Sequence, residues 1–194
     1  MNVYFIRHGK TKGNLEGRYV GRTDEGLLED FVQELKKKSM PKVGKIYVSP
    51  MIRCMETCQY IYPDCEYEVV EDLKEIDFGD FEYKSYEELN GNEIYQNWID
   101  SNGEMPFPNG ESMVTFQNRC KFAFDDVIKN AMESEYKDVA FVVHGGTIMA
   151  ILDAYSNPHK DYFHWQVKNG CGYQGRIEVK DERMVISTLH RIFD

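Results

Sequence analysis

Three short apolar runs, each followed at once by polar residues, recur along the chain and constrain its fold more than any other feature. The runs and the polar residues at their ends are NVYFI with Arg7-His8-Gly9, KIYVS with Ser49-Pro50, and DVAFVV with His144-Gly145-Gly146. Continuous apolar segments of this length are typical of strands buried on both faces of a parallel sheet. Because helical segments alternate with these runs, the sequence predicts an α/β fold: three layers, α/β/α, with a mostly parallel open sheet and helices on both faces.

Apolar residues recur at helical spacing in the segments between the strands. We expect helices at 27–38, 51–62, 85–98 and 112–134, and Pro50 stands where the second of these begins, a position that its fixed φ suits. The chain closes with two β segments, 171–180 and 182–190, which meet at Asp181-Glu182. These segments predict a hairpin at one edge of the sheet.

The length of the chain limits the number of domains. With 194 residues and 22.7 kDa, it can bury one sizeable core but not two independent ones. We therefore expect residues 1–194 to form a single domain. Between about residues 72 and 110 the periodicity weakens, and NGEMPFPNG interrupts regular structure with Gly and Pro. This stretch is predicted to be a small inserted cap.

The charge balance excludes several classes of partner. The chain has 23 Lys and Arg against 33 Asp and Glu, a net charge of −10, and the segment 64–104 holds 14 acidic and 2 basic residues. Nucleic acid and anionic membranes repel such a protein at long range, so neither is an expected partner. No run approaches the roughly 18 apolar residues of a membrane helix, and the N-terminus lacks a signal-peptide pattern. We expect a cytoplasmic protein.

The five cysteines do not predict a disulfide framework or a metal site. Their number is odd, and no CxxC spacing occurs among them. Cys54 and Cys58 stand one helical turn apart, but no nearby His or Cys pair would complete a zinc site. We expect reduced thiols and no bound metal.

The polar residues after the three runs define the candidate site. In open α/β sheets, ligands bind outside the carboxyl ends of the strands. The side chains expected to meet there are those of Arg7, His8, Ser49, Arg53 and His144. The sequence therefore predicts a cationic site inside an acidic protein.

These residue types suit chemistry on a phosphoryl group. Arg7 and Arg53 offer planar, permanently charged donors for phosphoryl oxygens. An imidazole such as His8 is a competent nucleophile toward phosphorus when a ring nitrogen is unprotonated and nearby cations offset the phosphate charge. A leaving alkoxide needs a proton, and Glu75 in LKEIDFGDFE is our candidate general acid.

An ordered set of motifs resembles a known family. The set comprises Arg7-His8-Gly9 with Thr11 and Asn14, Ser49-Pro50 with Arg53 and Thr57, Glu75 before Phe78-Gly79, Gly110-Glu111-Ser112, and His144-Gly145-Gly146-Thr147. In this order they resemble the histidine phosphatase superfamily, in its phosphoglycerate-mutase-like branch, from Val3 to about Leu152.

The resemblance implies a role for each matching residue. It implies that His8 becomes phosphorylated, that Arg7, Arg53 and His144 form the phosphate pocket, and that Glu75 is the proton donor. By the same resemblance, Asn14 and the backbone at Gly145 add donors to the phosphoryl oxygens. The resemblance implies no metal and no other cofactor.

Alternatives remain at several positions. Asn14 can equally cap the backbone locally, and Asp77 is a second candidate for the acid. Lys10 departs from the Glu or Gln that usually follows the family's Arg-His-Gly, and we expect its side chain to point to solvent.

The substrate is predicted only as a small-molecule phosphate monoester. Phosphatases and mutases of the superfamily share the phosphohistidine and differ in the acceptor of the phosphoryl group. The cap region nearly lacks Lys and Arg, which disfavours a substrate with two anionic groups, while its aromatic residues could stack on a leaving group or form a packed subcore.

Within the superfamily, DFGDFE, NGES and WQVKNGCGY look most like α-ribazole phosphatases, which act in cobalamin biosynthesis. This favours α-ribazole 5′-phosphate as a possible substrate. A mutase-type phosphotransferase and a non-catalytic protein that binds a phosphorylated ligand are the alternatives. The oligomeric state is open, with a homodimer as one possibility.

Overall fold

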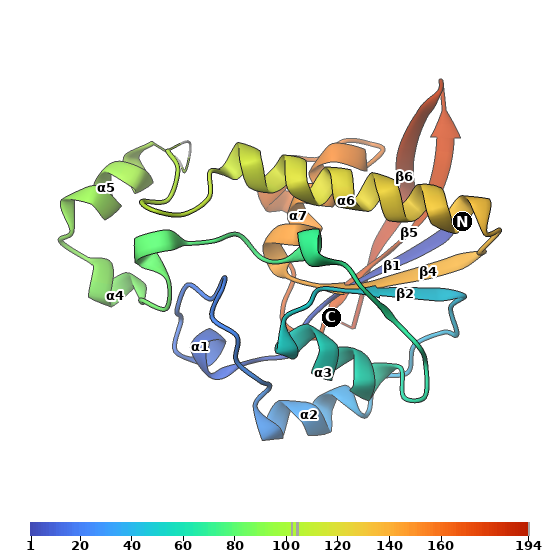
Figure 1. The fold of residues 1–194 in the computed structure, drawn as a ribbon, viewed down its shortest axis with the longest axis horizontal. Coiled ribbons are helices and arrows are strands. Elements are labelled where there is room, and N and C mark those ends of the chain that lie inside the picture. Colours follow the sequence, from blue (N-terminus) through green and yellow to red (C-terminus); the bar gives the residue numbers. More distant parts are fainter. Residues whose placement is uncertain (102, 104, 194) are drawn as a thin grey trace.

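A twisted sheet crosses the molecule, and the residues of the candidate site follow the carboxyl ends of its central strands. The computed structural model describes residues 1–101, 103 and 105–193. In this part of the chain the sheet has six strands in the order β3-β2-β4-β1-β5-β6 (Figure 1). The strands are β1 Asn2–Arg7, β2 Lys45–Val48, β3 Glu68–Val69, β4 Asp138–Val143, β5 Gly172–Lys180 and β6 Arg183–Ile192. The first four in this order pair in parallel, and β5 and β6 join antiparallel.

Helices cover both faces of the sheet, because the strands expose apolar side chains alternately to each face. The helices are α1 Lys12–Leu15, α2 Glu29–Leu35, α3 Ile52–Ile61, α4 Tyr86–Leu89, α5 Glu93–Asp100, α6 Met113–Glu133 and α7 Gly145–Tyr155. On one face, Phe5 and Phe141 pack with α6 and α7. On the other, Ile6 and Val142 pack with α2 and α3. The predicted three-layer α/β fold with a mostly parallel sheet is confirmed.

Two predicted helices differ from those in the structure. The helix expected over 27–38 is only Glu29–Leu35, because Leu27 pairs with Thr11 in a β-bridge and Leu28 is the N-cap. The helix expected over 85–98 is divided into α4 and α5. Gly91 between them has φ +81°, and Asn92 begins α5 by accepting hydrogen bonds from two backbone N–H groups.

The segment between β3 and α6 lies across the carboxyl ends of the strands. In Figure 1 its α4 and α5 extend beyond the sheet, with α4 next to α1. Aromatic side chains hold this segment together: Phe81 packs edge-to-face on Tyr95 and Phe107, and Trp98 packs on Phe107 at 4.8 Å between ring centroids. Phe81, Tyr95 and Phe107 are each at most 4% exposed, so they form a subcore rather than an open stacking surface.

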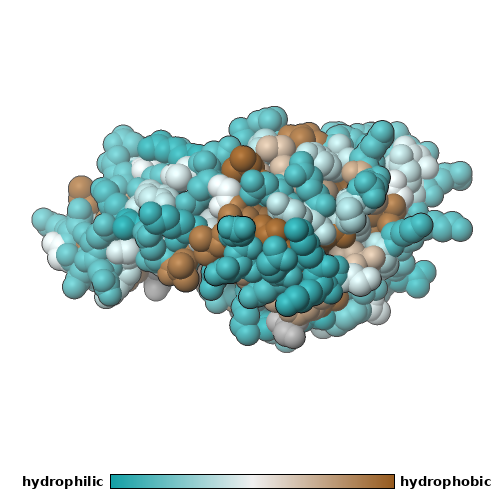
Figure 2. Space-filling view, turned by 90° about the horizontal axis from the view of Figure 1, so that it is seen from below, coloured by the Kyte–Doolittle hydropathy of each residue, from teal (hydrophilic) through white to brown (hydrophobic). Residues whose placement is uncertain are grey.

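The face of the molecule seen from below is mostly polar. Figure 2, which shows the molecule from below, has scattered hydrophobic areas among predominantly hydrophilic residues. Within the described residues, no helix has both the length and the apolar character that a membrane-spanning segment requires.

Candidate active site

The strand register brings the predicted site residues together. In adjacent parallel strands, Val142 of β4 pairs with Ile6 of β1 on one side and with Val48 of β2 on the other. The polar residues that follow these three positions therefore emerge side by side. The rings of His8 and His144 lie 5.2 Å apart, edge to face.

His8 is held with one ring nitrogen available. Its Nδ1 lies 2.7 Å from the carbonyl oxygen of Gly9, which can only accept, so Nδ1 carries the proton and Nε2 has the free lone pair. The side chain is 4% exposed. Burial, and after it the positive charges of Arg53 and Arg7, keep the pKa of His8 well below its usual range. The ring is therefore neutral near pH 7, as a nitrogen nucleophile must be.

His144 lies deeper, at the N-terminus of α7. Its Nε2 shares a 2.7 Å hydrogen bond with the Ser49 hydroxyl, and the Cys54 thiol lies 3.6 Å from the same nitrogen. Burial, followed by the charges of Arg53, His8 and Arg7, lowers the pKa of His144 well below its usual range. Burial raises the pKa of Cys54 to about 12, so this thiol is protonated and does not compete as a nucleophile.

Two arginines supply the positive charge of the site. Arg7 donates from Nη1 to the carbonyl of Val167 at 2.7 Å. Arg53 is fully buried and donates to the carbonyls of Thr23 and Gly21 at 2.8 and 2.9 Å, which orients its guanidinium. Within the described residues, the Nε atoms of both arginines are buried and have no acceptor. Buried donors of this kind are costly to leave unpaired, so they are preorganised to receive an anion.

Glu75 reaches the site from the segment after β3. Its Oε2 accepts from Gly146 N–H of α7 at 3.0 Å, and its Oε1 accepts from its neighbour Ile76 N–H at 3.0 Å. Burial raises the pKa of Glu75, against the opposing effects of these two N–H groups and of Arg53 and Arg7. A buried carboxyl group with a raised pKa in a site with two arginines can donate a proton to a leaving oxygen.

The side chain of Asp77, the alternative acid, makes local structural contacts. Its Oδ1 accepts from Gly79 N–H at 2.8 Å, and its Oδ2 lies 3.6 Å from Arg22. The geometry therefore favours Glu75, which alone of the two contacts α7.

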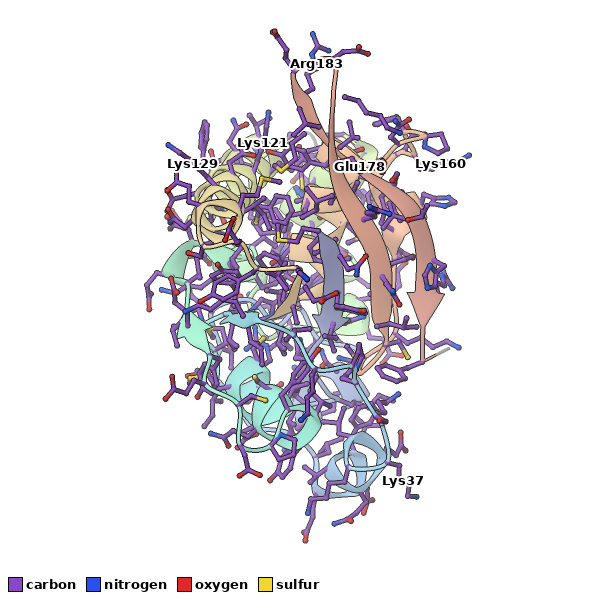
Figure 3. All side chains as sticks on the ribbon, turned by 90° about the vertical axis from the view of Figure 1, so that its right-hand side faces the viewer. Lys37, Lys121, Lys129, Lys160, Glu178 and Arg183 are labelled. Carbon is purple, nitrogen blue, oxygen red and sulfur yellow. The ribbon has the colours of Figure 1, made fainter. Side chains whose placement is uncertain are left out.

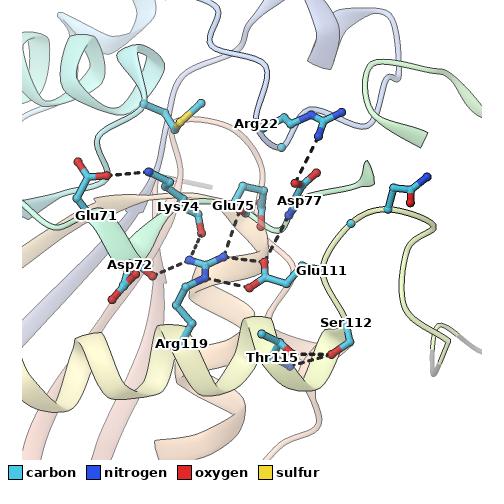
Figure 4. A pocket seen from close by; sticks show the side chains of 14 residues that line it. Arg22, Glu71, Asp72, Lys74, Glu75, Asp77, Glu111, Ser112, Thr115 and Arg119 are labelled. Atoms are coloured by element: carbon cyan, nitrogen blue, oxygen red, sulfur yellow. Dashed lines mark hydrogen bonds and ion pairs between the residues drawn. The ribbon is translucent and has the colours of Figure 1, made fainter. Parts of the chain in front are cut away.

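Arg119 anchors the segment that carries Glu75, a role that the sequence analysis missed. Its guanidinium donates to both carboxylate oxygens of Glu111 at 2.8 and 3.0 Å, and to the backbone carbonyls of Asp72 and Lys74 at 2.7 and 3.2 Å (Figure 4). Nothing in the local sequence marks Arg119, because the backbone groups it holds lie far along the chain.

In the structure Asn14 caps the backbone locally, and its contact with a phosphoryl group stays a prediction. Its Oδ1 accepts from Thr11 N–H at 3.3 Å in a capping box and from Asn169 Nδ2 at 3.0 Å. Asn169, also missed from sequence, donates in addition to the carbonyl of His8 at 3.2 Å and so fixes the backbone of the candidate nucleophile. Lys10 is half-buried, where an exposed side chain was expected.

Gly145 and Gly146 allow the backbone of α7 to approach the site closely. A Cβ on Gly145 would lie 3.4 Å from the Arg7 guanidinium, and one on Gly146 would lie 2.2 Å from Glu75 Oε1. Hence only glycine at these two positions lets α7 lie this close to Arg7 and Glu75, and the Gly146 N–H at the positive end of the helix dipole donates to Glu75 Oε2.

A pocket of about 540 Å³ opens beside Glu75. It is lined by Gly21, Arg22, Met51, Glu71, Asp72, Lys74, Glu75, Asp77, Asn109, Gly110, Glu111, Ser112, Thr115 and Arg119 (Figure 4). None of these described lining residues is aromatic. Three ion pairs, those of Lys74, Arg22 and Arg119, neutralise part of its acidic charge. The pocket is thus suited to a polar group bonded to a phosphate held by the arginines.

No group of three or more His, Cys, Asp or Glu side chains in the described residues is arranged to share a metal ion.

Neutral imidazoles, unpaired arginine donors and a carboxyl group at a helix N-terminus define a site for phosphoryl transfer. A family model described as the histidine phosphatase superfamily (branch 1) matches residues 3–191. The chain belongs to this superfamily of enzymes, as its motifs predicted, and its substrate class is a phosphate ester.

Three relatives illustrate the range of similar proteins. A protein of Hydrogenobacter thermophilus named "Putative phosphoserine phosphatase 2" is 32% identical over 161 residues, which cover 77% of this chain and 76% of the relative. A histidine-to-alanine variant of phosphoserine phosphatase from Entamoeba histolytica, solved in complex with phosphoserine, has a TM-score of 0.75 at 26% identity, covering 97% and 95% of the two chains. The α-ribazole phosphatase of Shigella flexneri has a TM-score of 0.77 at 22% identity, covering 96% and 94%, which shows the shared fold.

Proposed function

We propose that this protein is a phosphomonoesterase that works through a phosphohistidine on His8. Nε2 of His8 attacks phosphorus as the ester P–O bond breaks, and the leaving oxygen takes the proton of Glu75. The Glu75 carboxylate then removes a proton from water, whose oxygen attacks phosphorus. The P–N bond breaks, inorganic phosphate leaves, and His8 and Glu75 regain their starting forms.

The observation that carries this proposal is the state of His8. It is neutral, its Nδ1 proton is committed to the Gly9 carbonyl, and its Nε2 lone pair is free. Arg7 and Arg53 beside it keep buried Nε donors without acceptors in the described residues. Together they supply a nucleophile and a charge complement for the phosphoryl oxygens, which supports catalysis over binding alone.

We propose further that residues 72–110 act as a cap of the single domain, because this segment supplies both the acid and six of the 14 described residues that line the pocket beside it. The acceptor in the second step is then water. A mutase needs cations to retain a second anionic group, whereas the cations of this pocket are already paired with Glu71, Asp77 and Glu111.

The polar pocket favours a small, polar leaving alcohol such as serine. Phosphoserine has a carboxylate as its second anionic group, but the adjacent ammonium group offsets that charge. The carboxylates of the pocket can receive this ammonium group. The names of the two phosphoserine phosphatase relatives agree with this choice. α-Ribazole 5′-phosphate is the second candidate, favoured by similarity to α-ribazole phosphatases over nearly the whole fold.

The test is the release of inorganic phosphate, without added metal, from phosphoserine, α-ribazole 5′-phosphate, 3-phosphoglycerate, sugar phosphates and p-nitrophenyl phosphate. We expect turnover by the wild-type protein and none by His8→Ala. An acid-labile, base-stable phosphoryl label should appear on the wild-type protein alone. Binding of phosphate without His8-dependent turnover would contradict the proposal and indicate a ligand-binding protein, and turnover that requires a bisphosphate primer would indicate a mutase.

A further inference from the structure

A second pocket, distinct from the candidate active site, lies against the C-terminal hairpin. It has a volume of about 400 Å³, within the range of pockets that hold small ligands. Its described lining includes Lys160, His164, Trp165, Tyr173, His190 and Arg191, and no acidic residue belongs to it. Four of these described residues can carry positive charge, although the chain as a whole has a net charge of −10.

The floor of this pocket is aromatic and rigid. Trp165 and Tyr173 are 5% and 3% exposed and pack edge-to-face at 5.3 Å between ring centroids. Trp165 Nε1 donates to the Lys160 carbonyl at 3.0 Å, and Arg191 lies 5.9 Å over the Tyr173 ring. Exposed basic side chains therefore lie around a buried aromatic base, and several such side chains can donate charge-assisted hydrogen bonds to one small multivalent anion.

The backbone at Thr188 is strained in the wall of the same pocket. Its φ is +53°, a conformation that a β-branched residue rarely adopts. The Thr188 carbonyl lies 3.1 Å from Nδ1 of His190, which orients this imidazole. The strand therefore departs from regular geometry at the position where it presents His190.

One backbone segment connects this pocket to the candidate active site. On the pocket side, the carbonyl of Gln166 accepts from the Tyr173 hydroxyl and from Arg191 Nη2, both at 3.3 Å. On the other side, the next carbonyl, that of Val167, accepts from Arg7 at 2.7 Å. Arg191 and Arg7 thus donate to the carbonyls of two consecutive residues.

We propose that this pocket binds small multivalent anions, such as tricarboxylates or phosphorylated metabolites, and that their binding alters the placement of Arg7. An anion between Lys160, His190 and Arg191 draws the Arg191 guanidinium away from the Gln166 carbonyl. The segment that positions the Val167 carbonyl then loses an anchor, Arg7 is less well oriented, and turnover falls.

The chain offers a local reporter of binding, because it has two tryptophans and one of them forms the pocket floor. The indole N–H signal of Trp165 can be followed by ¹⁵N NMR, with Trp98→Phe as the assignment control. We use citrate as the probe and hold ionic strength constant with sodium chloride. We expect a saturable shift of the Trp165 signal in the full-length protein.

Charge reversal at the rim tests the site. Lys160→Glu should weaken citrate binding at least tenfold, and His190→Glu serves as a second variant if the first fails to fold. Lys129→Glu on α6 is the matched control, since Figure 3 places Lys129 on the opposite side of the molecule from Lys160. Lys129→Glu changes the net charge by the same amount as Lys160→Glu. It should bind citrate as tightly as the wild-type protein does. Equal binding by Lys160→Glu, or a shift that sodium chloride alone reproduces, would overturn the proposal.

Kinetics test the connection to Arg7. Citrate that competes in the active site raises KM alone, whereas citrate in the second pocket lowers kcat at saturating p-nitrophenyl phosphate. We expect a severalfold lower kcat in the wild-type protein and in Lys129→Glu, and a smaller effect in Lys160→Glu. A kcat that is unchanged while the Trp165 signal saturates would overturn the connection.

Discussion

At the scale of single residues, the site depends on opposite shifts of two groups. Burial lowers the pKa of His8 and raises that of Glu75, because in each case it disfavours the charged form. The nucleophile thus stays unprotonated in moderately acidic solution, and the acid stays protonated at a higher pH than a free carboxyl group. Burial thus keeps the nucleophile His8 neutral and the acid Glu75 protonated at the same time.

These shifts predict the pH profile. Hydrolysis of an alkyl phosphate needs neutral His8 and protonated Glu75, so kcat/KM should fall as pH rises through the raised pKa of Glu75. p-Nitrophenyl phosphate has a good leaving group and should lack this basic limb. Glu75→Gln should lose about 10²- to 10⁴-fold on alkyl phosphates and much less on p-nitrophenyl phosphate. Equal losses on the two substrates would count against Glu75 as the acid.

Gly146 should be as sensitive as Glu75 itself. A Cβ at this position would lie 2.2 Å from Glu75 Oε1, so Gly146→Ala must displace the carboxyl group. Alanine suits a helix better than glycine, so α7 itself should not be weakened. We expect a loss of about 10²-fold on alkyl phosphates with p-nitrophenyl phosphate turnover largely retained. Steady-state kinetics on both substrates decide the matter, and unchanged alkyl turnover would show that Glu75 does not act from this position.

The sequence predicted the strand-end residues better than the residues that hold them. Arg7, His8 and His144 follow apolar runs, and sheet topology alone brings such positions together. Arg119 and Asn169 act through hydrogen bonds to backbone carbonyls that are distant in the sequence. No local sequence pattern predicts such hydrogen bonds. Asn14 illustrates the same limit, because asparagine is common both in ligand contacts and in caps.

At the scale of secondary structure elements, α6 fixes the segment that bears Glu75. Arg119 of α6 pairs with Glu111 in a bidentate contact in which both side chains are less than a quarter exposed. Arg119→Ala should destabilise the protein by about 2 to 3 kcal/mol, because it leaves that carboxylate and two carbonyls without their donor. It should also reduce alkyl phosphate turnover more than p-nitrophenyl phosphate turnover.

Urea denaturation and the same two-substrate kinetics measure these effects. Lys121→Ala, an exposed change on the same helix, is the control and should alter the free energy of unfolding by less than about 0.5 kcal/mol. Arg119→Lys should recover little, since lysine lacks the planar fork. A full recovery would mean that charge alone, and not the shape of the guanidinium, holds the segment.

The division of the expected helix 85–98 is also a matter of local backbone chemistry. Its apolar periodicity continues across the break, so periodicity alone predicts one helix. The Asn-Gly-Asn sequence overrides it, because Gly91 adopts positive φ and Asn92 caps α5. In the strands, apolar pattern and local backbone chemistry agree. The sequence analysis placed five strand segments, and the structure confirms each to within two residues at each end. The predicted segments are 2–6, 45–49, 138–143, 171–180 and 182–190.

Gly91→Ala should therefore destabilise the protein by about 1 kcal/mol, the cost of a left-handed conformation for a residue with a Cβ. No atom lies within 4 Å of the added Cβ, so the cost is one of backbone conformation and not of a clash. Asn90→Ala, at ordinary φ in the same link, is the matched control. Thermal denaturation of the two variants distinguishes them, and equal stability would refute the conformational argument.

At the scale of the whole molecule, an acidic protein concentrates positive charge in one buried place. The site draws Arg7 from β1, Arg53 from α3, Glu75 from the segment after β3 and His144 from the start of α7. These positions span most of the chain, so a phosphate analogue that binds here should stabilise all of the elements together. If residues 1–194 form the predicted single domain, the whole chain should therefore unfold in one cooperative transition that the phosphate analogue shifts.

Orthovanadate should therefore raise the melting temperature in one transition. At a concentration of about 100 times its Kd, the expected gain is about 2.7 kcal/mol, or roughly 5 to 10 °C for a chain of this size. Arg7→Met should abolish most of this rise, because it removes a buried donor that has no acceptor within the described residues. Arg183→Met at the exposed tip of the hairpin is the control and should keep it. Differential scanning calorimetry is the measurement. Two transitions, of which only one responds to vanadate, would show that residues 1–194 do not fold as a single unit.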